Sequence, residues 1–508
     1  MPPETWSSES PLPSRREFLD PDWQEHAPFL RAIRHAADED SSPVLIFADW
    51  WEDQGRFEQA ALLRLRVESE TLPPTHPRHH ESRVQADRLV RVIMERTGSR
   101  EPWSNRVEPA SPWARLATLG LIARWRYGCP DMISWGGSTP MPDLFQNAID
   151  LAPLTGLEIL SCDRSGFSRL RTLKWPSPLR RLSIPSGDHD GLRGDRLVQL
   201  LDTWNSSDSL VELSLPVEIL LGPDEPVGQL VSRLPRGLKR LRLTSTANHL
   251  DEAARPLGDA GLARLLDWEG LEKLEELALT HQELTDHSAL RLALSPALRG
   301  LRHLDLSFNL IGNRGVHALS TSGYLEGLRT LRLAGNALGN AAARSIGSNS
   351  PLGNLHHLDL SANHLGDSGL HFLLSSEFLT ELSVLEIGGN RMGLKAEGFP
   401  GWGRLDGGPR ILRLDVSYNP VDPDRGVSRI FESPVLQDLV IWEVKGLDLS
   451  LLAEALVHGE RLPRLRRLDA RDARLPDSLA EAWTNSRHGQ LDLLRGSVVG
   501  ASFMGASI

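Results

Sequence analysis

Apolar residues recur along this chain in one repeated frame, with leucine at its first, fourth and sixth positions. Regular copies of the frame begin at Leu274, Leu301, Leu328, Leu355, Leu382 and Ile411, and the first five starts are each 27 residues apart. Because the fourth and sixth positions alternate with a period of two, each copy predicts a short strand with one buried face. A near-constant interval of this length is typical of a solenoid, whose repeats stack on their neighbours.

Asparagine occupies the ninth position of the frame, where the chain leaves the strand. The residues concerned are Asn309, Asn336, Asn363, Asn390 and Asn419. An asparagine amide both donates and accepts hydrogen bonds, so it can satisfy backbone groups that a turn leaves unpaired. We therefore expect these side chains to form a structural ladder along the core.

A helix is predicted in the second half of each repeat. It would begin near Asp286, Asn313, Asn340 or Asp367, which are residue types that favour helix N-caps. It would bury Leu292, Leu319, Ile346 or Leu373. Each repeat is thus a strand followed by a helix.

Looser copies extend the array in both directions. They begin upstream at Leu157, Leu179, Leu210 and Leu238 and downstream at Leu436 and Leu465. We expect about 12 repeats over residues 151–494 and a carboxyl-terminal tail over 495–508.

The frame resembles the leucine-rich repeat family, in its ribonuclease-inhibitor-like class with strand and helix in each repeat. The resemblance implies an α/β solenoid in the form of a horseshoe. Parallel strands would line the concave face and helices would cover the convex face.

The amino-terminal third shows no repeat frame. Residues 1–25 are rich in proline and serine, and we expect a poorly ordered arm. Residues 26–70 predict a small helical domain, with apolar faces supplied by Phe29-Leu30-Ile33 and Leu45-Ile46-Trp50. Residues 71–150 would be a linker, including a helix near 84–95, and a segment that bridges to the first repeat.

The helical stretch resembles a short bacterial repeat-companion domain found ahead of repeat arrays. The matching residues are Phe29-Leu30-x-Ala32-Ile33, Phe47-Ala48-Asp49-Trp50-x-Glu52-x-x-Gly55 and Leu63-Arg64-Leu65. Trp51 and Val44 depart from the leucine and arginine expected there. The resemblance implies no known activity.

Composition narrows the function classes. The 508 residues include 56 Lys and Arg against 67 Asp and Glu, a formal net charge of −11. This balance argues against a general nucleic-acid binder, which needs a basic field to neutralise phosphates. No apolar run is long enough to span a membrane, and because residues 1–6 lack the basic segment and apolar core of a signal peptide we expect none. Two cysteines cannot make a disulfide framework. We expect a cytoplasmic protein, a monomer, without a cofactor.

Three sequence features could carry chemistry, and each has a simpler interpretation. His76, His79 and His80 could hold a metal ion, but no cysteine or carboxylate pair stands at zinc spacing, so a solvated linker is favoured. Ser368, within Gly-Asp-Ser-Gly, occupies the position where other repeats begin a helix, so it is not predicted to be a nucleophile. Trp50 is favoured as a core residue over a docking anchor, while both interpretations stay open for Trp51.

The repeat frame also predicts which side chains face the concave side. Residues at the third and fifth positions of the frame point there, opposite to the buried leucines. The fifth position is rich in acids towards the carboxyl end, and basic side chains lie beside it. The candidate partner-binding residues are His303, Asp305, His357, Asp359, Glu386, Arg413, Asp415, Arg467 and Asp469. In the repeat at Leu436 the same frame places Asp438 and Val440 on this face.

These observations favour a non-catalytic scaffold whose concave face binds an unknown protein partner, one with a basic surface. The alternative is a regulator of an enzyme, such as an inhibitor or GTPase activator, a role that the same repeat class includes. An enzyme is the third hypothesis, because no nucleophile–base pair or metal site stands out.

Overall fold

The computed structural model describes most of the chain between residues 23 and 494. The described residues are 23–36, 39–73, 76–97, 122–126, 129–136, 146, 149, 154–174, 179–185, 189, 191–192, 194–203, 209–220, 234–245, 256–392, 408–420, 438–446, 464–465, 467–470 and 492–494. The tail predicted at 495–508, and all but the last few residues of the arm predicted at 1–25, lie outside them. The chain divides into two compact units, residues 1–213 and 214–508.

The described part of unit 1 starts with four helices. They are α2 (Trp23–His35), α3 (Ser42–Asp53), α4 (Phe57–Thr71) and α5 (Pro77–Thr97). In α3 the buried side chains are Val44, Phe47, Ala48 and Trp51, the spacing of one helical face. The predicted face was therefore wrong: Ile46 is 57% exposed, and Trp51 rather than Trp50 is fully buried.

Strands follow these helices in unit 1. They are β1 (Ile122–Arg126), β2 (Cys129–Trp135), β3 (Gly156–Ile159) and β4 (Arg181–Ser183), with helices α8 (Arg164–Leu170) and α9 (Asp195–Thr203) and the start of β5 (Glu212–Pro216). The pair β1–β2 is antiparallel, whereas β2, β3 and β4 pair in parallel.

The first repeat starts three residues earlier than predicted. Leu157 pairs in register with Leu182, which is the fourth position of its own frame. The frame therefore starts at Leu154, which is buried, and the predicted core residue Leu160 is 47% exposed. Leucines spaced by three permit two offset frames here, and burial of one strand face selects between them.

Unit 2 holds the regular repeats. Its strands are β6 (Arg240–Thr244), β7 (Glu276–Thr280), β8 (His303–Asp305), β9 (Thr330–Arg332), β10 (His357–Asp359), β11 (Val384–Glu386), β12 (Arg413–Asp415), β13 (Ile441–Glu443), β14 (Arg467–Asp469) and β15 (Asp492–Leu494). Its helices are α10 (Val217–Leu220), α12 (Gly258–Leu265), α13 (Asp286–Ala293), α14 (Asn313–Ser320), α15 (Asn340–Gly347) and α16 (Asp367–Leu374), with short 3-10 helices at Leu271–Lys273, Pro296–Gly300 and Ser350–Leu352.

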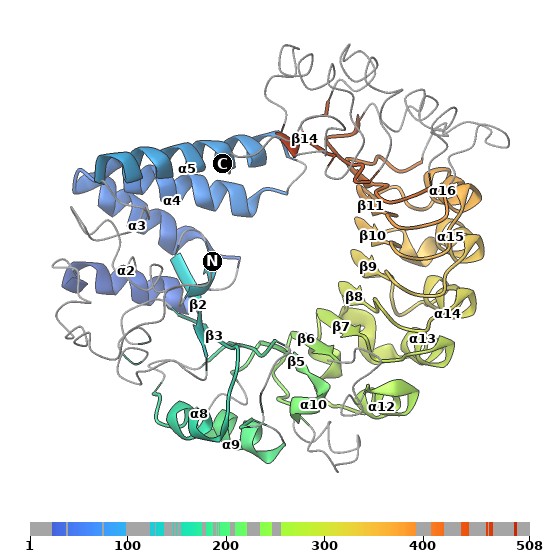
Figure 1. The fold of residues 1–508 in the computed structure, drawn as a ribbon, viewed down its shortest axis with the longest axis horizontal. Coiled ribbons are helices and arrows are strands. Elements are labelled where there is room, and N and C mark those ends of the chain that lie inside the picture. The colour runs from blue at the N-terminus through green and yellow to red at the C-terminus, as the bar shows by residue number, and fades with distance from the viewer. Residues whose placement is uncertain are drawn as a thin grey trace. The chain divides into compact units, whose positions relative to one another are not determined.

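The strands of unit 2 pair in chain order and in parallel. Within this unit the strands β7 to β11 lie on the inner side of the array and the helices α12 to α16 on its outer side (Figure 1). The fourth-position leucines Leu304, Leu331, Leu358, Leu385 and Leu414 stand in register and are fully buried. The predicted α/β solenoid is confirmed, with helices starting where they were expected.

One further repeat is shifted by three residues. Trp442 pairs with Leu414, so the frame predicted to start at Leu436 starts at Leu439. Leu439, Trp442 and Val444 fill its apolar positions and are fully buried. The shift moves Glu443 onto the outward strand position where the sequence had placed Val440. Strand β15, beyond the last predicted frame, was not anticipated.

The asparagine at the ninth position bonds the backbone of neighbouring repeats. Asn363 is 3% exposed. Its Nδ2 donates to the carbonyl oxygens of Leu333, Leu360 and Ser361, and its Oδ1 accepts the N–H groups of Asn336 and Leu338. Asn309, Asn336, Asn390 and Asn419 bond in the same way. Gln282 occupies the same position in the preceding repeat and extends the ladder, because its Oε1 accepts the N–H of Leu257.

The polar residue that starts each helix has a different role from the one predicted. It is already helical, and its oxygen caps the helix of the next repeat. Asn313 Oδ1 lies 2.9 Å from the nitrogen of Gly339 and 3.1 Å from that of Ala342. Asp286 caps Gly312 and Gly315, and Asn340 caps Gly366 and Gly369, with the same spacing. We call this the capping relay; it is needed because the N-caps of α14, α15 and α16 are glycines, which carry no side-chain oxygen.

Candidate binding face

The third and fifth positions of the repeat frame form the outward side of the sheet, which we call the strand face. In unit 1 its charges are paired internally. Arg181 is 3% exposed and Asp131 is 1% exposed, and their Nη1 and Oδ1 atoms are 3.0 Å apart. Glu212 Oε2 lies 3.4 Å from Nε of the same arginine. These buried side chains pair with one another, whereas the strand face of unit 2 carries charged side chains that are partly exposed, such as Arg332 and Arg413.

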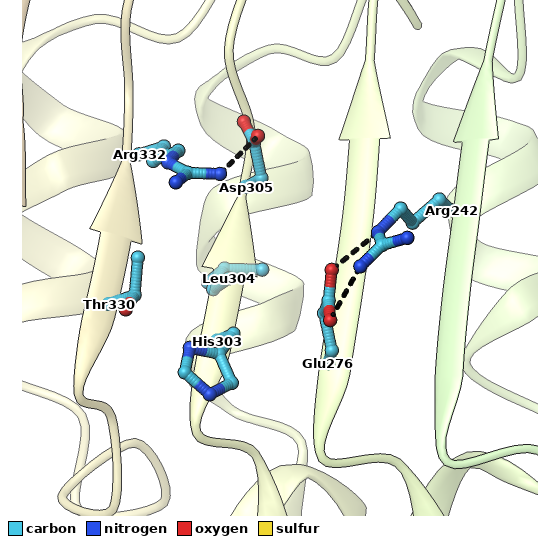
Figure 2. A pocket seen from close by; sticks show the side chains of 7 residues that line it. All are labelled: Arg242, Glu276, His303, Leu304, Asp305, Thr330 and Arg332. Atoms are coloured by element: carbon cyan, nitrogen blue, oxygen red, sulfur yellow. Dashed lines mark hydrogen bonds and ion pairs between the residues drawn. The ribbon is translucent and has the colours of Figure 1, made fainter. Parts of the chain in front are cut away.

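A shallow pocket of about 310 Å³ lies on strands β6 to β9. Its lining residues are Arg242, Glu276, His303, Leu304, Asp305, Thr330 and Arg332. Figure 2 shows Arg242 and Glu276 facing each other across β6 and β7, with Nε–Oε1 and Nη2–Oε2 distances of 2.6 Å and 3.0 Å. Arg332 Nη1 lies 3.9 Å from Asp305 Oδ2 on the next strand pair (Figure 2). Acids and bases are balanced in this half of the face.

The other half, on strands β10 to β14, carries a continuous chain of ion pairs. His357 Nε2 lies 3.4 Å from Glu386 Oε1, which lies 3.4 Å from Arg413 Nη2. Arg413 Nη2 is also 2.6 Å from Glu443 Oε1. Glu443 Oε2 is 2.6 Å from Lys445 Nζ, which is 3.4 Å from Asp469 Oδ2. We call these six residues the ion-pair chain.

Acids nevertheless outnumber bases on these strands, because the fifth position is acidic on each of them. Asp359, Glu386, Asp415, Glu443 and Asp469 stand side by side in register. The Asp469 side chain is only 2% exposed, so it contributes its charge rather than a contact surface. The side chain of Arg467, also predicted for this face, lies outside the described part of the structure.

Three of the aspartates also shape the turn that follows their strand. Oδ1 of Asp305, Asp359 and Asp415 accepts the N–H of the serine two residues later, at 2.8–2.9 Å. Short polar side chains commonly bond the backbone in this way. These three acids therefore also stabilise the local backbone, in addition to carrying charge on the strand face.

Burial and neighbouring charges set the proton affinities along this row. Burial raises the pKa of Asp359 and of Asp415, with like charge from Glu386 and Glu443 adding to the effect. Burial alone would also raise the pKa of Glu386, but the hydrogen bond and charge of His357, together with Arg413, bring it below its ordinary value. Burial lowers the pKa of His303, near the pocket, and Arg332 lowers it further.

Because the pKa of Asp359 is raised, we expect replacement by the neutral residue asparagine, which has the same shape, to increase the stability of the fold in a pH-dependent way. When the pKa of an acid is higher in the folded than in the unfolded protein, its contribution to stability is fully present at pH values below the unfolded-state pKa. That contribution is lost as the pH rises through the folded-state pKa. Asp359→Asn should therefore be more stable than the wild type by a few tenths of a kcal/mol near neutral pH. Urea unfolding at about pH 7 and about pH 4 should show this advantage shrinking at the lower pH. An advantage of equal size at both values would mean that ionisation of Asp359 is not its source.

Two features of this face were missed from the sequence. Glu443 and Lys445 were not predicted on this face because the frame of their repeat was placed three residues too early. Trp442 could have indicated the correct frame, since an apolar residue is expected at the fourth position. The second feature is a column of residues directly before each ladder position, at the end of each strand, which we call the edge row. It consists of His281, Phe308, Gly335, Ala362, Gly389, Tyr418 and Gly446, all with φ between 53° and 70°.

The serine and histidine candidates for catalysis or metal binding lie at the starts of helices. Ser368 lies in the first turn of α16, as predicted. The helix α5 starts at Pro77, so His79 and His80 belong to its first turn rather than to a linker. Among the described residues, no group of three or more His, Cys, Asp or Glu is placed to hold a metal ion. Burial raises the pKa of the Cys162 thiol to about 12.

The repeated strand–helix unit and its outward charged strands define an α/β solenoid with an open strand face. Its repeats are similar to a known family: the family model described as Leucine Rich repeat matches residues 299–320 and 354–374. No curated protein sequence matches the chain. Among the described residues, no helix has the length and apolar character to cross a membrane.

Among the solved structures that align with the chain, two illustrate the low level of similarity. A chain of the yeast Rad7 and Elc1 complex aligns with a TM-score of 0.41 and 12% identity, over 84% of this chain and 90% of that chain. A chain of the complex of the Arabidopsis receptor kinase HAESA with the peptide hormone IDA and the co-receptor SERK1 aligns with a TM-score of 0.29 and 17% identity. That alignment covers 68% of this chain and 53% of the other.

Proposed function

We propose that this protein is a non-catalytic interaction scaffold that binds a basic surface of a protein partner. The binding site is the acidic half of the strand face, on β10 to β14. One observation carries the proposal: the fifth frame position is acidic on five consecutive strands whose residues stand in register.

Such a row is unfavourable for the isolated protein. Like charges on directly adjacent strands repel each other by a few tenths of a kcal/mol per pair. The bases of the ion-pair chain offset part of this repulsion. The pKa values of Asp359 and Asp415 are raised, chiefly by burial and further by the like charge of Glu386 and Glu443. A basic partner would relieve the remaining repulsion and would be attracted from a distance.

The test is to remove two of the charges without changing the shape of their side chains. Proteins captured on the immobilised chain from its source cell would be identified by mass spectrometry, and the affinity of each would then be measured with purified components. We expect Asp359→Asn with Glu386→Gln to weaken binding of the true partner about tenfold at low ionic strength. The difference should shrink as salt is added, because the surface charges are screened.

A matched control removes the same number of charges elsewhere. Glu377 and Glu381 are exposed and lie outside the strands, so Glu377→Gln with Glu381→Gln should leave the affinity nearly unchanged. If the strand-face variant binds the partner as tightly as this control at low salt, the acidic row is only a solvated surface and the proposal fails.

A further inference from the structure

The pocket on β6 to β9 contains polar side chains that the protein itself does not use. Among the described residues, the hydroxyl of Thr330 and the imidazole of His303 have no hydrogen-bond partner. The guanidinium of Arg332 has one contact, the ion pair of 3.9 Å with Asp305, and this distance is longer than a hydrogen bond. The Arg332 side chain is also 46% exposed. Unused donors that converge in a pocket are typical of a binding site.

These three side chains lie together on strands β8 and β9. His303 stands in register with Thr330, and Asp305 stands in register with Arg332 two residues further along the same strands. Figure 2 shows His303 and Thr330 beside each other, with Arg332 reaching from β9 towards Asp305 on β8. Both strands and their neighbours β7 and β10 belong to residues 256–392, which the structure describes without a gap. This part of the pocket is therefore bordered by described residues on either side.

The two acids of the pocket are engaged by other groups. Glu276 accepts two hydrogen bonds from Arg242, at 2.6 Å and 3.0 Å. Oδ1 of Asp305 accepts the N–H of Ser307 at 2.9 Å. The unused donors on β8 and β9 are therefore not held by the acids beside them.

Two further arginines add positive charge at the border of the pocket. Arg302 and Arg329 directly precede His303 and Thr330, and both are exposed. Neither forms an ion pair in the part of the chain that the structure describes. Burial lowers the pKa of His303, and the charges of Arg332 and of these two arginines lower it further, so all three lie near the ring. The pocket and its border thus hold four arginines against two acids.

A carboxylate matches both the charge and the donors of this site. The planar fork of a guanidinium fits the two oxygens of a carboxylate. A hydroxyl and a neutral imidazole can each donate one further hydrogen bond to the same group. The excess of arginines would attract an anion from a distance. Aspartate and glutamate are the side chains through which a protein partner presents this group.

We propose that Arg332, Thr330 and His303 bind a carboxylate side chain of the partner. The proposal rests on the proposed function and extends it, because the partner surface would then be of mixed charge, with an acid on β8 and β9 and bases on β10 to β14. Adjacent strands are about 4.8 Å apart, so β9 and β11 are separated by about 10 Å. Three residues of extended chain span this distance. An acid and a base three residues apart could therefore reach Arg332 and Glu386 together.

The test uses capped synthetic peptides of the form acetyl-Gly-Xaa-Gly-Gly-Zaa-Gly-amide. Xaa is glutamate or its neutral isostere glutamine, and Zaa is lysine or glutamine, which gives four peptides. Binding to the full chain would be followed by NMR titration. We expect glutamate at Xaa to bind about threefold to tenfold tighter than glutamine with the same Zaa. This range lies between the values for an exposed ion pair and for a charged hydrogen bond.

Two variants remove the donors, and a third serves as the matched control. Arg332→Gln should abolish the preference for glutamate, and Thr330→Val, which keeps the shape of the side chain, should reduce it. Neither position has a side-chain hydrogen bond in the described structure, so both variants should fold. Arg314→Gln removes one exposed arginine from α14, on the helix side of the array. It changes the net charge as Arg332→Gln does and should keep the full preference.

The outcomes separate this inference from the proposed function. If the wild type binds glutamate and glutamine peptides equally, or if Arg332→Gln and Thr330→Val keep the preference as Arg314→Gln does, the carboxylate site is overturned. The choice between lysine and glutamine at Zaa tests the acidic row instead. That preference should be lost when Asp359 and Glu386 are neutralised, while the preference for glutamate at Xaa should remain.

Discussion

Asn363→Ala should lower the free energy of unfolding by about 3 kcal/mol, the upper end of the range for leaving a buried polar group without its partner. The alanine would remove the acceptor of two buried N–H groups, those of Asn336 and Leu338, both 3.1 Å from Oδ1. It would also remove the donor to three carbonyl oxygens. Water cannot replace these bonds without entering the core between repeats. Urea unfolding followed by circular dichroism measures the loss.

Asn354 provides the matched control for this change. It lies in the same repeat array, is exposed, and makes one side-chain bond, to the carbonyl oxygen of Glu326. Asn354→Ala should change the stability by less than about 0.5 kcal/mol, as surface substitutions commonly do. A loss for Asn363→Ala no greater than this would show that its five bonds do not hold the repeats together.

Trp51→Ala should destabilise the helical part of unit 1 by about 4 kcal/mol, within the range for truncating a buried aromatic side chain. Trp51 is fully buried, and its ring packs on Phe47 with centroids 4.5 Å apart. The ring of His26 also contacts it, with centroids 6.2 Å apart, so the truncation would leave a cavity beside both rings. Urea unfolding, or the rate of protease cleavage within α3 to α5, reports the change.

The control for Trp51 is the residue that the sequence had placed on the buried face. Ile46 is 57% exposed, so Ile46→Ala should change the stability by less than about 0.5 kcal/mol. Equal losses at the two positions would mean that α3 is rotated relative to the face described above.

The periodic part of this fold was predictable because its two periodicities are explicit in the sequence. Leucines alternate along each strand and recur at a constant interval, so burial of one face leaves a single register for the strands between β7 and β12. Prediction failed at Leu157 and Leu436 for a physical reason. Apolar residues spaced by three fit two frames there, and only pairing with the neighbouring strand selects one of them.

The candidate site was predictable in position but not in its interactions. Between β8 and β12 the frame indicates which side chains leave the sheet opposite to the buried leucines. It does not contain the distances that join Glu386 to Arg413 or Lys445 to Asp469, since these depend on long side chains reaching across strands. The edge row could not be predicted from the frame either. The left-handed backbone conformation of Phe308 and Tyr418 is known only from their φ angles in the structure.

The capping relay gives the array a direction. Asn313 completes the start of α15 and Asn340 completes the start of α16, so each of these two helices is capped from the repeat before it. A shortening from the carboxyl end would leave every remaining helix with its cap, whereas a shortening from the amino end would leave the first remaining helix without one. Loss of repeats should therefore be tolerated better from the carboxyl end of this stretch than from its amino end.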